Sequence, residues 1–119
     1  MITNLTIHEA TPTQIRVGVI DLEGENLKTL KGLLDFRELP STTDLYARAQ
    51  KVAALIPEGV EIAMIGGAPF FMAPLERALH ARDITCLYAF SVRESVEAVQ
   101  ADGSILKTAV FRHRGFVGW

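Results

Sequence analysis

Hydrophobic and polar positions recur with two different periods along the chain, which predicts β-strands interleaved with helices. Three apolar runs have the length and β-branched content of buried strands: residues 2–7, 60–65 and 84–90. Helical spacing of the apolar residues lies between them, over residues 27–34, 41–56 and 69–82. Because strands that alternate with helices pair in parallel through right-handed crossovers, we expect a small Rossmann-like α/β domain.

Local signals refine where these elements begin and end. Thr11 and Gln14 form a capping-box pattern, and the helix that they open is expected to be short because Gly18 breaks its period. Residues 36–39 are expected to form a further short strand that ends at Pro40. Pro74 lies inside a helical pattern, which predicts that the regular part of that helix begins only there.

The pattern changes to alternation after Glu94. Asp102 and Gly103 separate two alternating segments, residues 96–100 and 105–111, and an Asp-Gly pair between such segments is a strong hairpin signal. We therefore expect a parallel sheet with a C-terminal antiparallel β-hairpin, which extends the sheet or reaches a second subunit.

Composition limits the classes of partner. The 119 residues are expected to form one domain spanning 1–119. The net charge of -2 gives no overall positive potential that would attract duplex DNA or an anionic membrane. No run approaches the ~20 apolar residues that span a bilayer, and no signal peptide is recognised. The single cysteine, Cys86, lies in an apolar run and is expected to be buried. A chain with one cysteine forms no internal disulfide, so we expect a reducing, cytoplasmic environment.

Polar or small residues follow each of the three main apolar runs. His8 follows the first, Gly66 and Gly67 follow the second, and Ser91 and Arg93 are expected to end the third. The carboxyl ends of parallel strands form the crevice in which open α/β sheets bind ligands. The sequence therefore predicts one ligand site at this edge of the sheet.

The glycine loop suits a phosphate. Gly66, Gly67 and Ala68 precede a helix, so backbone N–H groups at its start could approach an anion, and Phe70 could stack on a base. The alternative is a tight strand-to-helix turn that needs glycine and binds nothing. Ser91 adds a directional donor for the same anion.

Three further side chains are candidates for chemistry. Arg93 offers a planar fork that matches a phosphate, and its alternative is a surface ion pair with Glu94 or Glu97. His8 or His113 could act as a general base, whereas the alternatives are a backbone-satisfied His8 and a solvated His113. The histidines and Cys86 lack the spacing of metal ligands, so we expect neither a metal nor a cofactor.

The order of short motifs resembles that of the small CRISPR-associated accessory proteins of type III systems. The motifs are Asn4-Leu5-x-x-His8, Thr11-x-x-Gln14, the glycine loop, Tyr88-Ala89-Phe90-Ser91-x-Arg93, Asp102-Gly103-Ser104-x-x-Lys107 and Val110-Phe111-Arg112-His113-x-x-Phe116. The resemblance spans most of the chain and is strongest over residues 87–117. Proteins of that family are single-domain, CARF-like α/β proteins that act on cyclic oligoadenylates.

The resemblance implies a homodimer that binds cyclic tetra-adenylate across its two-fold axis and degrades it without a metal. The ribose 2′-hydroxyl would attack the adjacent phosphorus, with His8, Arg93 and His113 as catalytic candidates. By the same resemblance, Gly66, Gly67, Ser91 and Arg93 would hold phosphates. Ala68 and Phe70 complete the ligand-binding candidates on the grounds given above for the glycine loop. Two alternatives remain at this point: a module that sequesters the nucleotide without cleaving it, and a mobile-element protein whose basic tail docks on a protein partner.

Overall fold

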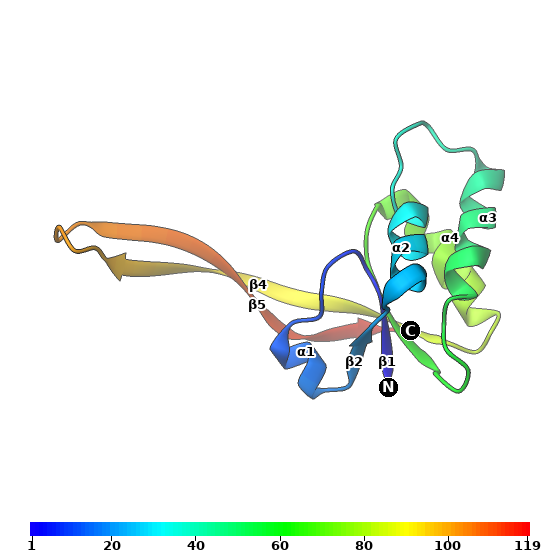
Figure 1. Cartoon of the computed structure of the whole chain (residues 1–119), viewed down its shortest axis with the longest axis horizontal. Coiled ribbons are helices and arrows are strands. Elements are labelled where there is room, and N and C mark those ends of the chain that lie inside the picture. Colours follow the sequence, from blue (N-terminus) through cyan, green and yellow to red (C-terminus); the bar gives the residue numbers. More distant parts are fainter.

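A five-stranded mixed sheet runs through the molecule in the order β2-β1-β3-β4-β5 (Figure 1). The computed structural model describes residues 1–119. The strands are β1 (Ile2–Leu5), β2 (Val19–Asp21), β3 (Ile62–Ile65), β4 (Thr85–Val99) and β5 (Ile105–Gly118). Strands β2, β1, β3 and β4 are parallel neighbours, and β5 is antiparallel to β4. The predicted α/β class, with a parallel sheet and a C-terminal antiparallel hairpin, is confirmed.

Three of the four helices cover one face of this sheet. The helices are α1 (Pro12–Arg16), α2 (Gly24–Leu33), α3 (Thr42–Ala53) and α4 (Pro69–His80). Helices α2, α3 and α4 stand together on one side of the body, and α1 lies apart from them beside β4 and β5 (Figure 1). None of these helices has the length and apolar character needed to cross a membrane.

Two apolar clusters correspond to the two faces of the sheet. The larger cluster joins Leu5, Ile65 and Cys86 of the sheet to buried residues of α2, α3 and α4. Met64 points to the opposite face and belongs to the smaller cluster, against which Phe116 of β5 packs. Adjacent residues of a strand point to opposite faces, so β3 contributes to both clusters, as its uninterrupted apolar sequence predicts.

The last two strands continue far beyond the body as a hairpin. Beyond Tyr88, the last residue of β4 that pairs with β3, β4 pairs with β5 alone. We call residues 91–113 the arm; it gives the molecule its longest dimension, 56 Å (Figure 1). The predicted turn at Asp102 and Gly103 is confirmed, with the Ser104 hydroxyl donating to the Asp102 carboxylate at 2.6 Å.

Several predicted boundaries are wrong. Strand β4 does not end at Ser91, because its pairing with β5 carries it on to Val99. Helix α4 begins at Pro69 and passes through Pro74, so the second proline does not mark its start. Residues 19–21, for which no strand was predicted, form β2, which is too short to show an alternating pattern.

The expected strand at residues 36–39 is absent. Phe36 packs edge-on against Phe70 and Phe71 of α4, with ring centroids 5.0 Å and 5.5 Å apart. The guanidinium of Arg48 donates to the carbonyls of Leu33 and Asp35 at 3.1 Å and 2.9 Å. These contacts bind the segment to helices, where no neighbouring strand is available to pair with it.

Candidate ligand-binding cleft

A cleft of about 810 Å³ opens at the carboxyl edge of the sheet, where β1, β3 and β4 end their mutual pairing. Its lining comes from the loop after β1, α1, the glycine loop after β3, β4 and the arm, and one residue that follows α2: Thr6, Ile7, His8, Glu9, Thr11, Gln14, Leu34, Met64, Ile65, Gly66, Gly67, Ala68, Tyr88, Ala89, Ser91 and Phe111. The segments after the three main apolar runs therefore meet in one cleft.

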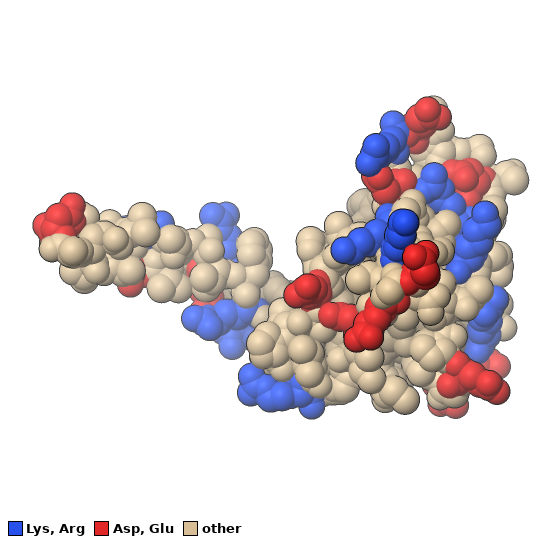
Figure 2. Space-filling model, viewed as in Figure 1, with Lys and Arg blue, Asp and Glu red and all other residues tan.

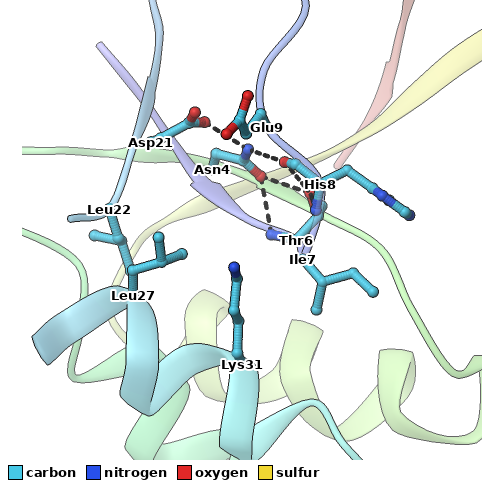
Figure 3. A pocket seen from close by; sticks show the side chains of 9 residues that line it. All are labelled: Asn4, Thr6, Ile7, His8, Glu9, Asp21, Leu22, Leu27 and Lys31. Atoms are coloured by element: carbon cyan, nitrogen blue, oxygen red, sulfur yellow. Dashed lines mark hydrogen bonds between the residues drawn. The ribbon is translucent and has the colours of Figure 1, made fainter. Parts of the chain in front are cut away.

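The loop between β1 and α1 is held by Asn4, a buried residue that is only 3% exposed. Its amide nitrogen donates to the Asp21 carboxylate at 2.7 Å and to the His8 carbonyl at 2.8 Å (Figure 3). Its amide oxygen accepts from the N–H and the hydroxyl of Thr6 at 2.9 Å and 2.8 Å. All four bonds of the amide are made, so the network fixes the loop that carries His8.

The imidazole of His8 takes no part in this network. It turns away from Asn4 and Thr6 (Figure 3), and no hydrogen bond of the structure involves its ring. The alternative of a ring satisfied by the backbone near Thr11 is therefore wrong. A smaller hollow of about 50 Å³ lies on the other side of the network, where Lys31 of α2 points toward it (Figure 3).

The glycine loop forms the floor of the cleft between β3 and α4. A Cβ built on Gly66 would meet only the methyl group of Thr6, at 3.5 Å, which is ordinary contact. Gly67 has a φ of +136°, a conformation that side chains rarely adopt. Ala68 is the N-cap of α4 and makes no side-chain capping bond. Pro69 has no N–H and the N–H of Phe71 donates to the Ala68 carbonyl at 2.9 Å, so the N–H of Phe70 is the one left uncapped in this first turn.

Strand β4 contributes a partly buried phenol to the cleft. Burial, followed by the negative charge of Glu76 on α4, raises the pKa of Tyr88 to about 12. The same two causes raise the pKa of the Cys86 thiol to about 11, and this residue is fully buried as predicted. Both groups are neutral at physiological pH, and a hydrogen bond with the Glu76 carboxylate also helps to raise the pKa of the Tyr88 phenol.

Phe111 lines the cleft, although the sequence did not single it out as a site residue. It reaches the cleft from the arm although 74% of its surface is exposed. An exposed aromatic ring on the wall of a cleft is a platform on which a base can stack. The only signal for it is the alternation of the C-terminal segment, which places residue 111 on the same face as His113.

The structure places the predicted residues unequally. His8, Gly66, Gly67, Ala68 and Ser91 line the cleft. The other three predicted residues do not line it: Phe70, Arg93 and His113.

Phe70 and Arg93 are displaced for different reasons. Phe70 is turned onto Phe36 of the segment between α2 and α3, and this edge-on aromatic contact holds it on the helical side of the sheet. Arg93 emerges beside the cleft, directly opposite Phe111 on the arm, because β4 continues past the edge of the body. The ion pairs expected as its alternative are wrong as well, since Glu94 and Glu97 pair with other residues.

His113 joins the base of the arm to α1. Its Nδ1 lies 3.3 Å from the side-chain nitrogen of Gln14, and its ring meets Phe116 edge-on with centroids 4.8 Å apart. Gln14 is itself part of the predicted capping box with Thr11, which is confirmed by bonds of 3.0 Å and 3.2 Å. The alternative of a freely solvated His113 is therefore wrong, and the residue lies next to the cleft without lining it.

The basic C-terminal segment is largely neutralised by the strand beside it. Arg112 and Arg114 both pair with Glu94, and Lys107 lies 3.7 Å from Glu97. Figure 2 shows a few positive and negative groups along an arm whose surface is otherwise mostly uncharged. Arg93 is the one arginine of the arm without an ion pair. No group of three or more His, Cys, Asp or Glu side chains is arranged to hold a metal ion.

Fold and cleft together define a small α/β protein with a ligand-sized cleft at the carboxyl edge of its sheet. A family model described as the uncharacterized protein MJ1673 family matches residues 1–117. The chain therefore belongs to the MJ1673 family. No curated protein and no solved structure matches it.

Proposed function

We propose that the protein binds a cyclic oligoadenylate in this cleft and opens the ring. The observation that carries the proposal is that one cleft contains two different surfaces. Its wall holds the exposed ring of Phe111, and its floor holds the start of α4, which has no side-chain cap and follows Gly66 and Gly67. The first suits a base and the second suits a phosphate. The resemblance of residues 87–117 to type III CRISPR accessory proteins supplies the class of nucleotide.

The size of the cleft supports a shared ligand. The volume of about 810 Å³ lies within the usual range for a site that binds one small molecule. A ring of four nucleotides is larger than one mononucleotide, and it is two-fold symmetric. Two clefts related by a two-fold axis would each hold one half of cyclic tetra-adenylate. The proposal is therefore a cytoplasmic homodimer that lowers the concentration of a signalling nucleotide and leaves duplex DNA unbound.

The reaction uses the nucleophile that the substrate carries. The 2′-oxygen forms a bond to the adjacent phosphorus while the bond from phosphorus to the 5′-oxygen breaks, which yields a 2′,3′-cyclic phosphate and a 5′-hydroxyl. His8, whose ring is free at the cleft, takes the proton of the 2′-hydroxyl, and water returns one to the leaving 5′-oxygen. Backbone N–H groups at the glycine loop face the charge that develops on phosphate oxygens.

Sequestration without cleavage is the second candidate, and one observation favours it. No lysine or arginine is among the residues that line the cleft. Charge that develops on a phosphorane would therefore meet neutral donors only, which stabilise it less than a guanidinium does. A sequestering protein would bind the intact ring tightly and release it unchanged.

Gly66 offers a direct test of binding in the cleft. A leucine at this position fills the floor, while an alanine adds only the Cβ that meets the Thr6 methyl at 3.5 Å. We expect Gly66→Leu to abolish the binding of cyclic tetra-adenylate measured by calorimetry and Gly66→Ala to bind and fold as the unmodified protein does. Affinity that falls as salt rises would support contact with phosphates. Equal affinity in all three proteins would place the nucleotide elsewhere.

A further inference from the structure

The arm presents an open strand edge beside the cleft. Beyond Tyr88, β4 has β5 on one side and no strand on the other, so the N–H and C=O groups that face outward have no partner strand. This edge extends over residues 91–99, on the side of the arm nearest β3. Long open edges are templates for pairing with another chain, and proteins rarely leave them uncovered.

The arm is a two-stranded sheet with exposed apolar residues, and such a sheet is poorly stabilised when only water surrounds it. It consists of two strands, and a two-stranded hairpin without further packing is marginally stable. It exposes several large apolar residues: Val92, Val99, Ile105, Leu106 and Phe111. Most of its surface carries no charge (Figure 2). A third and a fourth strand beside it would provide the missing support.

The sequence of the open edge complements itself when it is reversed. Two such edges can pair antiparallel with Ser95 opposite Ser95 of the other copy. Each residue then lies opposite the one equally far on the other side of Ser95, so Val92 faces Ala98 and Glu94 faces Val96 of the other copy. Arg93 then faces the partner's Glu97, and the two-fold axis repeats this ion pair. Arg93 has no ion pair within its own chain.

Neighbouring registers lack this complementarity. Residues that lie opposite each other in a sheet point to the same face, and a two-fold axis perpendicular to the sheet leaves every residue on its own face. One residue must therefore lie opposite its own copy at the axis. Centring the pair on Arg93 or on Glu94 places two like charges opposite each other, which destabilises it. Centring it on Val96 opposes Arg93 to a valine and forms no ion pair.

We infer that two copies of this chain pair through their β4 edges, antiparallel and centred on Ser95, to form a continuous four-stranded arm sheet. In this register Ser91 lies opposite the partner's Val99, so the turn of the partner's hairpin reaches the mouth of the cleft, which Ala89 and Ser91 line. Each copy thus contributes the hairpin turn to the other's site. The inference gives the proposed homodimer its interface, but its tests need no nucleotide and can fail independently of the proposed function.

Charge reversal tests the register. We expect the unmodified protein to sediment as a dimer and Arg93→Glu to weaken dimerisation about tenfold or more, because each substitution acts twice across the axis. Glu97→Arg should weaken it similarly, and the double variant should restore it. Arg112→Glu, on the other face of the arm, is the matched control and should leave the dimer intact. A monomeric unmodified protein, or a double variant no better than the single ones, would overturn the inference.

A crosslink provides a second and independent readout. Ser95 is the one residue of the edge that faces its own copy, so Ser95→Cys should form a disulfide-linked dimer under mild oxidation. Thr108→Cys, on the outer strand of the arm, should not, and the native Cys86 is buried and out of reach. Crosslinking through Thr108→Cys in place of Ser95→Cys would overturn the β4 interface in favour of one through β5.

Discussion

The side-chain nitrogen of Gln14 lies 3.3 Å from Nδ1 of His113 and ties α1 to the base of the arm across 99 positions of the sequence. Apart from this contact, the base of the arm is held mainly by the pairing of β4 with β5 and by the packing of Phe116 on the smaller cluster. The contact therefore sets how the arm, with Phe111, stands against the cleft.

Removing this tie should loosen the arm. We expect His113→Ala to lower the free energy of unfolding by about 1–2 kcal/mol, since it removes one hydrogen bond and the aromatic contact with Phe116. Urea unfolding measures the loss, and hydrogen exchange should quicken in the arm. His80→Ala is the control, because this exposed ring makes a single hydrogen-bonding contact, with the carbonyl of Trp119, and lies far from the Gln14–His113 contact in the sequence. Equal stability of the two variants would contradict a positioning role for His113.

The amide of Asn4 should not tolerate a carboxylate. Asn4→Asp replaces the donor that faces Asp21 at 2.7 Å with a second negative charge, so we expect a loss of about 2–4 kcal/mol in unfolding free energy. Adding Asp21→Asn restores a donor and should recover part of the loss. If the single variant were as stable as the unmodified protein in urea, the network would not be what fixes the loop of His8.

Alkaline pH should destabilise the protein through Tyr88. Burial and Glu76 raise the pKa of this phenol to about 12 from an ordinary value of 10. A group with a raised folded pKa stabilises the fold below its unfolded pKa and loses that contribution as pH rises through the folded one. Stability should therefore fall between pH 10 and 12, and Tyr88→Phe should remove this part of the fall. Phenolate absorbance, compared between the two proteins, reports whether Tyr88 ionises late.

The fold was largely predictable because its signals are local. The three long apolar runs, the capping box at Thr11 and Gln14, and the turn at Asp102 each specify their element within a few residues. Failures came where distant contacts decide the structure. Residues 36–39 follow their packing on α4 and Arg48, and three-residue β2 exists only because β1 pairs with it.

The site was predictable in part for the same reason. The carboxyl ends of parallel strands meet at one edge of a sheet, which predicts that His8 and the glycine loop lie together, as they do in the structure. It misplaces Arg93, because nothing in the local pattern reveals that β4 continues as the arm. It also misses Phe111, whose place on the cleft wall depends on how two strands pair and on the contact between Gln14 and His113.

His8 should affect cleavage more than binding. We expect His8→Ala to bind cyclic tetra-adenylate with nearly unchanged affinity and to cleave it about 10²–10⁴ times more slowly, the usual contribution of a general base. His80→Ala, at the far end of α4, is the matched control and should cleave at the unmodified rate. Single-turnover assays with excess protein separate the chemical step from release. An unchanged rate in His8→Ala would remove this residue from the mechanism.

The central claim is that the cleft takes a cyclic oligoadenylate, and one incubation tests it most directly. Purified protein is mixed with cyclic tetra-adenylate in EDTA, and bound, intact and cleaved nucleotide are resolved by chromatography. We predict retention of the nucleotide followed by a linear product that ends in a 2′,3′-cyclic phosphate. Retention of an intact ring would favour sequestration over cleavage. No retention and no product, with this ring and with other ring sizes, would contradict the account.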